Sequence, residues 1–190
     1  LYVSYESAQK LKVEAADLTS HDLTPRQICD LELLMNGGFN PLKGFLTEED
    51  YDGVVENMRL ADGSLWPMPI TLDVSQAFAD SIEPGQDIAL RDQEGVILAI
   101  LSVTDSWTPN KSREAEKVFG ADDDAHPAVN YLHNVAGQVY LGGPVIGIKQ
   151  PVNFGLRLRR DTPKELGGYV GRGGGRGVAG WRAGRRVGGG

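Results

Sequence analysis

The stretch NGGFNPLKGFL, residues 36–46, places three glycines, a proline and two phenylalanines within eleven residues. This density of glycine and proline is typical of a turn, yet the segment is too apolar for an ordinary exposed loop. It lacks the pattern of a phosphate-binding loop, and no G-x-x-x-x-G-K-[ST] occurs anywhere in the chain, although Lys43 could contact an anion. We therefore expect a packed corner whose apolar side chains fill the space between two helices: Phe39, Leu42, Phe45 and Leu46.

Helix signals lie on both sides of this corner. Before it, Thr24 is placed as an N-cap, Pro25 takes the first helical position and Gln27 can close a capping box. Gly37 can end that helix in the left-handed conformation. After it, Thr47 can cap a second helix, whose buried face is predicted to contain Tyr51, Val54, Val55 and Met58.

The middle of the chain is rich in strand patterns. Residues 70–74 alternate apolar and polar side chains, and an apolar run in residues 96–101 predicts a central strand buried on both faces. Helices and strands do not alternate as in a doubly wound sheet, so a mixed α+β fold with a small, partly closed β-barrel and short helices fits best. Further expected elements are a strand at 88–91 with a turn at 92–95, a strand at 96–104, a helix from Asn110 to Gly120, and a strand at 139–141 or longer.

Charge divides the chain into an acidic body and a basic tail. The formal net charge is −7, but residues 167–190 hold five arginines and no acid, so the first 166 residues carry −12. Such a body is unsuited to nucleic acid, and we expect none as a partner. Twelve of those last 24 residues are glycine, which predicts disorder because few side chains can be buried.

Compartment follows from cysteine usage and hydropathy. The single cysteine, Cys29, excludes an internal disulfide and fits a reducing cytoplasm. Its apolar neighbours predict a buried helical thiol rather than a nucleophile. The longest apolar run, residues 96–101, is far too short to cross a bilayer, and the first residues have no signal-peptide pattern, so we expect a cytoplasmic protein.

Three motifs suggest ligands, but each has a simpler explanation. Asp122, Asp123, Asp124, His126 and His133 could bind a divalent metal, yet three adjacent acids more often mark a solvated loop. The G-x-G-x-x-G match at 175–180 follows no predicted strand and arises easily in a glycine-rich tail. The GRGGGRG run resembles an RNA-binding RGG segment but has few interleaved aromatic residues.

Several motifs in order resemble the N-terminal domain of ATP sulfurylase, or sulfate adenylyltransferase. They are the G-x-F-x-P-L-x-G-F signature at Gly38–Phe45, the acidic helix at Glu48–Met58 and the M-R-L-x-D-G-x-x-x-P-x-P-I segment at Met58–Ile70. The resemblance continues through IALRDQEGVILAIL, KVFGADDDAHPAV and YLGGPV and covers roughly residues 18–166. It implies a PUA-like β-barrel, in agreement with the strand-rich pattern.

The resemblance also implies a reaction, in which sulfate attacks the α-phosphorus of ATP to give adenosine 5′-phosphosulfate and pyrophosphate. In this family a following nucleotidyltransferase domain carries the chemistry on Q-x-R-N-P and H-x-x-H motifs, with magnesium accompanying ATP. Neither motif occurs in this sequence. We therefore assign no catalytic, substrate-binding, cofactor-binding or metal residue here, and expect the catalytic domain as partner and a homo-oligomer for the complete enzyme. Some members also carry an adenylylsulfate kinase domain.

The expected organisation has four parts. They are an N-terminal extension at 1–20, the PUA-like domain at 21–155, a linker with the start of the catalytic domain at 156–166, and the Gly/Arg-rich tail at 167–190. The extension is polar and expected to be mostly irregular, with room for a short helix. The tail is expected to be disordered or foreign to the family, for instance through a reading-frame shift in a GC-rich gene. The alternative is a stand-alone PUA-like binding module whose arginine tail recruits RNA.

Overall fold

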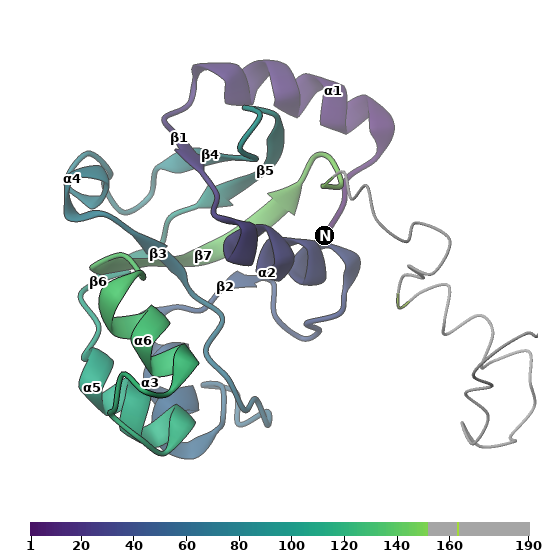
Figure 1. The fold of residues 1–190 in the computed structure, drawn as a ribbon. Coiled ribbons are helices and arrows are strands. Elements are labelled where there is room, and N and C mark those ends of the chain that lie inside the picture. Colours follow the sequence, from purple (N-terminus) through teal and green to yellow (C-terminus); the bar gives the residue numbers. More distant parts are fainter. Residues whose placement is uncertain (152–162, 164–190) are drawn as a thin grey trace, which may run out of the picture. The chain divides into compact units, whose positions relative to one another are not determined.

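The computed structural model describes residues 1–151 and Pro163, and its first compact unit contains residues 1–151. Figure 1 shows a curled sheet with helices on its outside. The helices are α1 (Tyr5–Glu14), α2 (Pro25–Asn36), α3 (Glu48–Asn57), α4 (Gln76–Ala79), α5 (Lys111–Glu114) and α6 (Pro127–Asn134), with the 3-10 turn η1 (Ala15–Asp17) and the π-helical η2 (Ala115–Phe119). The strands are β1 (Ser20–Asp22), β2 (Gly44–Phe45), β3 (Leu72–Val74), β4 (Asp87–Arg91), β5 (Ile97–Ser102), β6 (Asp105–Trp107) and β7 (Val139–Gly147).

Strand β7 organises the sheet. The main path runs β1-β4-β5-β7-β2, and β3 and β6 also pair with β7. The first half of β7 pairs with β3 and β6, whereas its second half pairs with β2 and β5. Because the partners change along one strand, the sheet curls, which confirms the prediction of a partly closed barrel. The expected strand at 139–141 is the beginning of this longer element.

The predicted helix caps are confirmed. The Thr24 hydroxyl accepts from the Gln27 backbone N–H while the Gln27 side chain accepts from the Thr24 N–H, and Gly37 ends α2 at φ 86°. Thr47 caps α3 by accepting from the N–H of Asp50. Tyr51, Val54 and Val55 form the buried face of α3 as predicted, but Met58 is exposed, because it ends the helix in the left-handed conformation. The helix expected from Asn110 to Gly120 is also present, although its second part, η2, is π-helical.

The alternation expected at residues 70–74 is wrong in one respect. All five residues are buried, including the polar Thr71 and Asp73, and only Leu72–Val74 form the strand β3. Both faces of β3 are therefore covered by protein. The Asp73 side chain is directed into a polar network, which is described below.

The first 20 residues belong to the compact unit rather than lying apart from it. The Leu1 ammonium donates to the Met35 carbonyl at 2.7 Å, and Tyr2 forms a bridge with Gly147. Helix α1, capped by Ser4, lies across the top of Figure 1. Together with η1 it covers β4 and β5, where a small core forms around Ala15, Ala89 and Ile100, with Leu11 and Leu18 packed against it.

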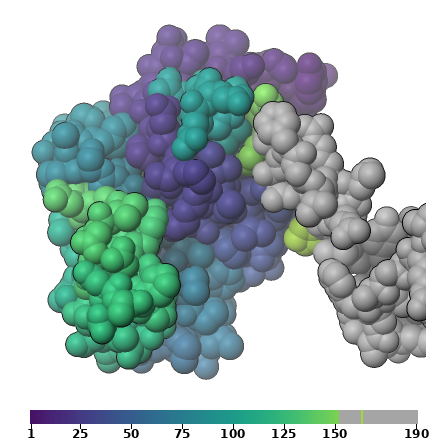
Figure 2. Space-filling view, in the orientation of Figure 1, coloured from purple at the N-terminus to yellow at the C-terminus, as the bar shows by residue number. Residues whose placement is uncertain are grey.

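Two further cores complete the unit. The largest one lies between the sheet and helices α2 and α3 and includes Leu31, Leu34, Val54 and Leu141. The third is small and joins η2 to α6 through Ala115, Val129 and Leu132, with Phe119 packed against it. In Figure 2 the segment 111–136 stands out as a lobe at the lower left, away from α1.

Candidate functional site

The corner at residues 36–46 is packed as predicted. Leu42, Phe45 and Leu46 are buried, and the partly buried Phe39 meets Trp66 edge to face at 5.6 Å between ring centroids. Gly44 explains why the segment needs a glycine here. In β2, an added Cβ at Gly44 would lie 2.0 Å from the carbonyl oxygen of Gly143 in β7.

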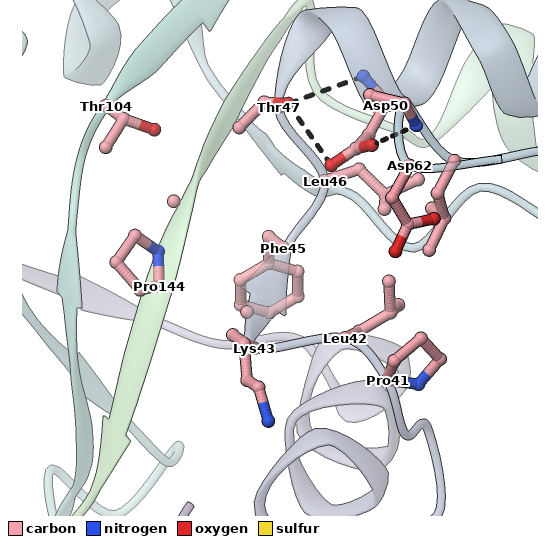
Figure 3. A pocket seen from close by; sticks show the side chains of 14 residues that line it. Pro41, Leu42, Lys43, Phe45, Leu46, Thr47, Asp50, Asp62, Thr104 and Pro144 are labelled. Carbon is pink, nitrogen blue, oxygen red and sulfur yellow. Dashed lines mark hydrogen bonds between the residues drawn. The ribbon is translucent and has the colours of Figure 1, made fainter. Parts of the chain in front are cut away.

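A cavity of about 420 Å³ lies beside this corner (Figure 3). Two acidic side chains, Asp50 and Asp62, line this cavity. Asp50, in the first turn of α3, already accepts from the Thr47 hydroxyl at 3.4 Å and from the Ala61 N–H at 2.8 Å. Figure 3 shows the Lys43 ammonium pointing away from Asp50 and Asp62. The cavity thus contains no converging set of groups for an anion, and the corner is structural.

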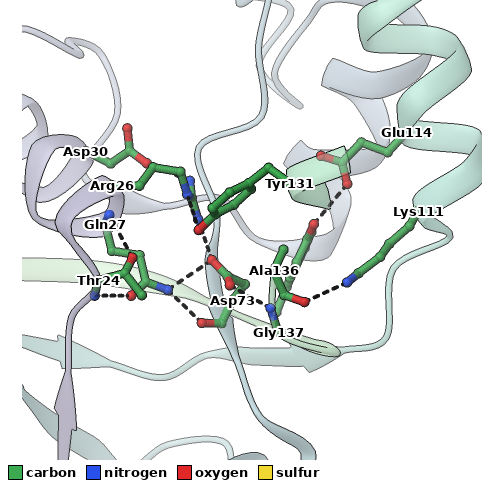
Figure 4. A network of polar contacts seen from close by, with 11 residues as sticks. Thr24, Arg26, Gln27, Asp30, Asp73, Lys111, Glu114, Tyr131, Ala136 and Gly137 are labelled. Atoms are coloured by element: carbon green, nitrogen blue, oxygen red, sulfur yellow. Dashed lines mark hydrogen bonds and ion pairs between the residues drawn. The ribbon is translucent and has the colours of Figure 1, made fainter. Parts of the chain in front are cut away.

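A polar network between α2, β3 and the 111–137 segment is the more distinctive feature (Figure 4). At its centre, the buried Asp73 binds through both carboxylate oxygens. Oδ1 accepts from the side chains of Arg26 and Gln27, and Oδ2 accepts from the Gly137 N–H at 2.7 Å. The Gln27 amide also donates to the Asp73 carbonyl at 2.7 Å. Asp73 therefore ties helix α2 to the loop before β7.

Arg26 connects this centre to helix α6. Its guanidinium pairs with Asp73, and also with Asp30, at a distance of 2.8 Å for the second pair. It donates through Nε to the Tyr131 hydroxyl at 3.2 Å and lies 5.4 Å from the centroid of the Tyr131 ring. Burial acts to lower the pKa of Arg26, but the bond to Tyr131 and the charges of Asp73 and Asp30 outweigh it and raise that pKa. Burial raises the pKa of Asp30 despite the neighbouring Arg26.

Glu114 lies on the other side of the network and is almost wholly buried, with 6% of its surface exposed. The hydroxyls of Tyr51 and Tyr140 donate to its Oε2 at 2.9 and 3.1 Å. Burial raises the pKa of Glu114, and the two hydroxyl bonds only partly offset this effect. Burial and the nearby carboxylate also raise the pKa values of both tyrosines.

Lys111 completes the network without neutralising Glu114. Its ammonium donates to the Ala136 carbonyl at 2.8 Å, and burial lowers the pKa of Lys111. The loop before β7 is thus held twice, by Lys111 at Ala136 and by Asp73 at Gly137. Gly137 approaches Val74 so closely that it leaves no room for a side chain. A Cβ added at Gly137 would lie 2.3 Å from the Val74 carbonyl oxygen.

A second cavity, of about 350 Å³, opens between Glu114 and Arg26. Its walls are mostly apolar or aromatic, and its polar groups come from α2, α5, α6, β7 and Thr71, which precedes β3. Hydrogen-bond acceptors and donors around a partly enclosed apolar space are the general composition of a small-molecule site. The lining includes Arg26, Met68, Glu114, Phe119, Tyr131, Leu132 and Tyr140.

The acidic cluster considered as a possible metal site comes together only in part. The ring nitrogens of His133 lie 3.0 Å from Asp122 and 3.1 Å from Asp124, whereas His126 caps α6 through the Ala128 N–H. Asp123 instead accepts from the N–H of Ala125. Within the part of the chain that the structure describes, no group of three histidine, cysteine or acidic side chains is arranged to hold a metal ion.

The prediction for Cys29 is wrong, because its side chain is exposed rather than buried. Cys29 follows Ile28, which is only partly buried, on the outer side of α2; the buried stripe of this helix is formed by Gln27, Leu31, Leu34 and Met35. The motif at 175–180, the GRGGGRG run, the linker at 156–166 apart from Pro163, and the tail at 167–190 lie outside the described residues.

Sequence reasoning missed the network because its members are far apart in the chain. Gln27 was noticed only as a capping residue, and Asp73 only as a polar position in an alternating strand. One signal was available for Glu114. It stands four residues before Val118 and so shares a helix face with this apolar residue.

The curled sheet with its outer helices is a partly closed barrel, and the comparisons identify its family. The family model described as PUA-like domain matches residues 1–150, so the chain belongs to that family. It is 50% identical over 155 residues to the sulfate adenylyltransferase of Saccharomyces cerevisiae and 48% identical over 160 residues to that of Schizosaccharomyces pombe. These matches cover 82% and 83% of the chain, but only 30% and 33% of the two relatives.

A solved structure also matches most of this chain while being itself matched over less than a third of its length. The chain resembles the hexameric APS kinase from Thiobacillus denitrificans with a TM-score of 0.70 and 34% identity, over 90% of this chain and 29% of that one. The chain therefore spans about a third of the length of the proteins it matches, and it corresponds to an N-terminal domain fragment of the sulfate adenylyltransferases. Among the described residues, no helix is long and apolar enough to cross a membrane.

Proposed function

We propose that this chain supplies the N-terminal PUA-like domain of a sulfate adenylyltransferase, which converts ATP and sulfate into adenosine 5′-phosphosulfate and pyrophosphate. The observation that carries the proposal is the level of identity, 47 to 50% over 155 to 162 residues, to relatives that bear this name. Identity at this level across an entire domain extends well beyond the short motifs of the 36–46 corner.

The role proposed for the domain is structural support of the catalytic part. Asp50, Asp73 and Arg26 are all engaged within the domain, and the described residues offer no carboxylate group suited to magnesium. These residues therefore do not fit a site for ATP with its magnesium. We assign both to the catalytic part of the complete enzyme and derive no step through them here.

The proposed partner of the domain is the catalytic domain of the same enzyme, and the complete enzyme is proposed to be a homo-oligomer. The length of the relatives supports the first proposal, and the word hexameric in the name of the Thiobacillus denitrificans protein supports the second. A cytoplasmic location is proposed on the single cysteine of the sequence.

Domain exchange tests the proposal. The region of the Saccharomyces cerevisiae enzyme that matches this chain is replaced by residues 1–150, and pyrophosphate release from ATP and sulfate is measured with a coupled assay. We expect the chimera to be active, whereas the chain of residues 1–190 alone releases no pyrophosphate above background. A folded but inactive chimera contradicts the proposed partnership, and activity of residues 1–190 alone contradicts the assignment of the chemistry to another domain.

A further inference from the structure

The cavity between Glu114 and Arg26 has an unusual charge balance. Two cationic side chains, Arg26 and Lys111, stand near three carboxyl groups, those of Asp30, Asp73 and Glu114. Arg26 is paired with Asp30 and Asp73, and Lys111 donates to a backbone carbonyl. Glu114 is therefore the one acid of this group that has no cation bonded to it.

The geometry of Glu114 leaves part of its carboxylate available. Both tyrosine hydroxyls donate to the same oxygen, Oε2, and no hydrogen bond within residues 1–151 reaches Oε1. Figure 4 shows this second oxygen on the side of Tyr131, toward helix α6. Glu114 and Tyr131 both line the cavity, so a carboxylate oxygen is presented to a space with aromatic walls.

The walls of the cavity favour a particular ligand. Phe119, Tyr131, Met68 and Leu132 line the cavity together with Glu114. One face of the Tyr131 ring is already covered by the Arg26 guanidinium, and Phe119 stacks on His126. Aromatic faces attract cations, and a charge-assisted hydrogen bond to a buried carboxylate is stronger than a neutral one. An anion is disfavoured, because Glu114 repels it and the Arg26 guanidinium is already paired with Asp30 and Asp73.

We propose that this cavity binds a small organic cation, a protonated amine or amidinium on a flat apolar group, with the cation against Glu114 and the apolar group between Phe119 and Tyr131. The cavity of about 350 Å³ lies at the small end of the usual range for ligand sites, which limits the ligand to about one ring with its substituent. This inference is independent of the proposed activity, since it concerns a site within the PUA-like domain itself.

Binding in this mode is coupled to proton release. The groups that face Glu114 are Tyr51 from α3, Tyr140 from β7, Arg26 from α2 and Lys111 from its own helix. Burial raises the pKa of Glu114, whereas a bound cation favours the carboxylate and lowers that pKa again. Affinity is therefore expected to rise with pH through the range in which free Glu114 titrates.

The test uses the chain of residues 1–190 with benzamidinium as the probe. Its neutral isostere benzamide and the anion benzoate serve as comparators, and affinities are measured by calorimetry in two buffers of different ionisation enthalpy. We expect benzamidinium to bind about tenfold or more tightly than benzamide, because a charged partner strengthens the bond to Glu114. We also expect it to release protons, and benzoate to bind most weakly.

Two variants locate the site, and one serves as a matched control. Glu114→Gln should remove the preference for benzamidinium over benzamide, whereas Glu116→Gln, on the exposed side of the same helical segment, should keep it. Ala128→Phe should fill the cavity from α6 without removing any polar group of the network and should weaken both ligands, which keeps the test valid if Glu114→Gln fails to fold. Equal affinity for benzamidinium and benzamide, undetectable binding of benzamidinium, or unchanged binding to Ala128→Phe would each overturn the proposal.

Discussion

Gly44 shows how a single residue can fix the path of a chain. It lies in β2 opposite Gly143 and Pro144 of β7, and its missing side chain allows the two backbones to meet. Its importance here comes from this close contact, since its own φ is not in the left-handed region. Backbone atoms cannot rotate away from an added methyl group, so relief requires the strands to separate.

We predict that Gly44→Ala lowers the free energy of unfolding by about 3 kcal/mol, at the upper end of common point mutations. Urea denaturation measures the change. Gly95→Ala is the matched control: Gly95 has φ 82° but open space around its Cβ position, so only the conformational cost of about 1 kcal/mol applies. Equal losses in the two variants would show that the contact with Gly143 is not limiting.

Asp73 is the second residue on which several elements depend. Replacement by alanine leaves the Gly137 N–H and one arm of Arg26 without their acceptor, and it removes one of the two bonds of the Gln27 amide, which keeps the Asp73 carbonyl. Removing one partner of a buried ion pair costs about 3 to 5 kcal/mol, but the Arg26 side chain is 35% exposed, so water recovers part of this. We therefore predict a loss of about 2 to 3 kcal/mol for Asp73→Ala in urea unfolding.

Asp22→Ala provides the comparison for this prediction. The pair between Asp22 and Arg91, at 2.8 Å, is much more exposed than that of Asp73, and such pairs contribute about 0.5 kcal/mol. A similar small loss at Asp73 would mean that the network contributes little to stability, and that its acceptors are easily replaced by solvent.

At the scale of elements, Glu114 joins α5 to α3 and β7 through two tyrosine hydroxyls, and its burial makes this joint sensitive to pH. The folded protein raises the pKa of Glu114, so it binds the proton more tightly than the unfolded chain does. The stability that this group contributes is then fully present below its ordinary pKa and is lost as the pH rises through its raised pKa.

We predict that the advantage of the wild type over Glu114→Gln shrinks as the pH rises above the ordinary glutamate range, because glutamine is never ionised. Urea midpoints measured between about pH 4 and pH 8 give the difference at each pH. Glu116→Gln should follow the wild type at all pH values. A gap that widens with pH would show instead that the folded state favours ionised Glu114.

The elements themselves were predictable to the extent that their signals are local. The caps at Thr24 and Thr47, the stop at Gly37 and the hairpin of β4 and β5 depend on residues a few positions apart. Strands β1, β2 and β6 are only two or three residues long and carry no detectable period. They exist because β4 and β7 offer unpaired edges, which no local pattern reveals.

The network was harder to predict for the same reason. Asp73 bonds to Gln27 across 46 positions and to Gly137 across 64, and Glu114 meets Tyr51 across 63. Sequence alone gives each of these residues an ordinary local role, as a cap, a strand residue or a helix residue. Their shared function in joining α2, α3 and α5 to the sheet follows only from the fold.

At the scale of the molecule, residues 1–151 close their cores with their own side chains. Helix α1 covers β4 and β5, α2 and α3 cover the main core, and η2 packs on α6. The segment directly after β7 is bonded to β5, because the N–H groups of Ile148 and Lys149 both donate to the Leu98 carbonyl. The match of the family model to residues 1–150 coincides with this closure.

We therefore predict that a chain of residues 1–151 folds on its own, with the same urea midpoint and the same denaturant dependence as residues 1–190. The denaturant dependence scales with the surface exposed on unfolding, so it reports whether the cooperative unit has changed. A control chain of residues 19–151 lacks α1 and η1 and exposes the core around Ala89 and Ile100, so its midpoint should fall. A lower midpoint for 1–151 than for 1–190 would place part of the stabilising interactions beyond residue 151.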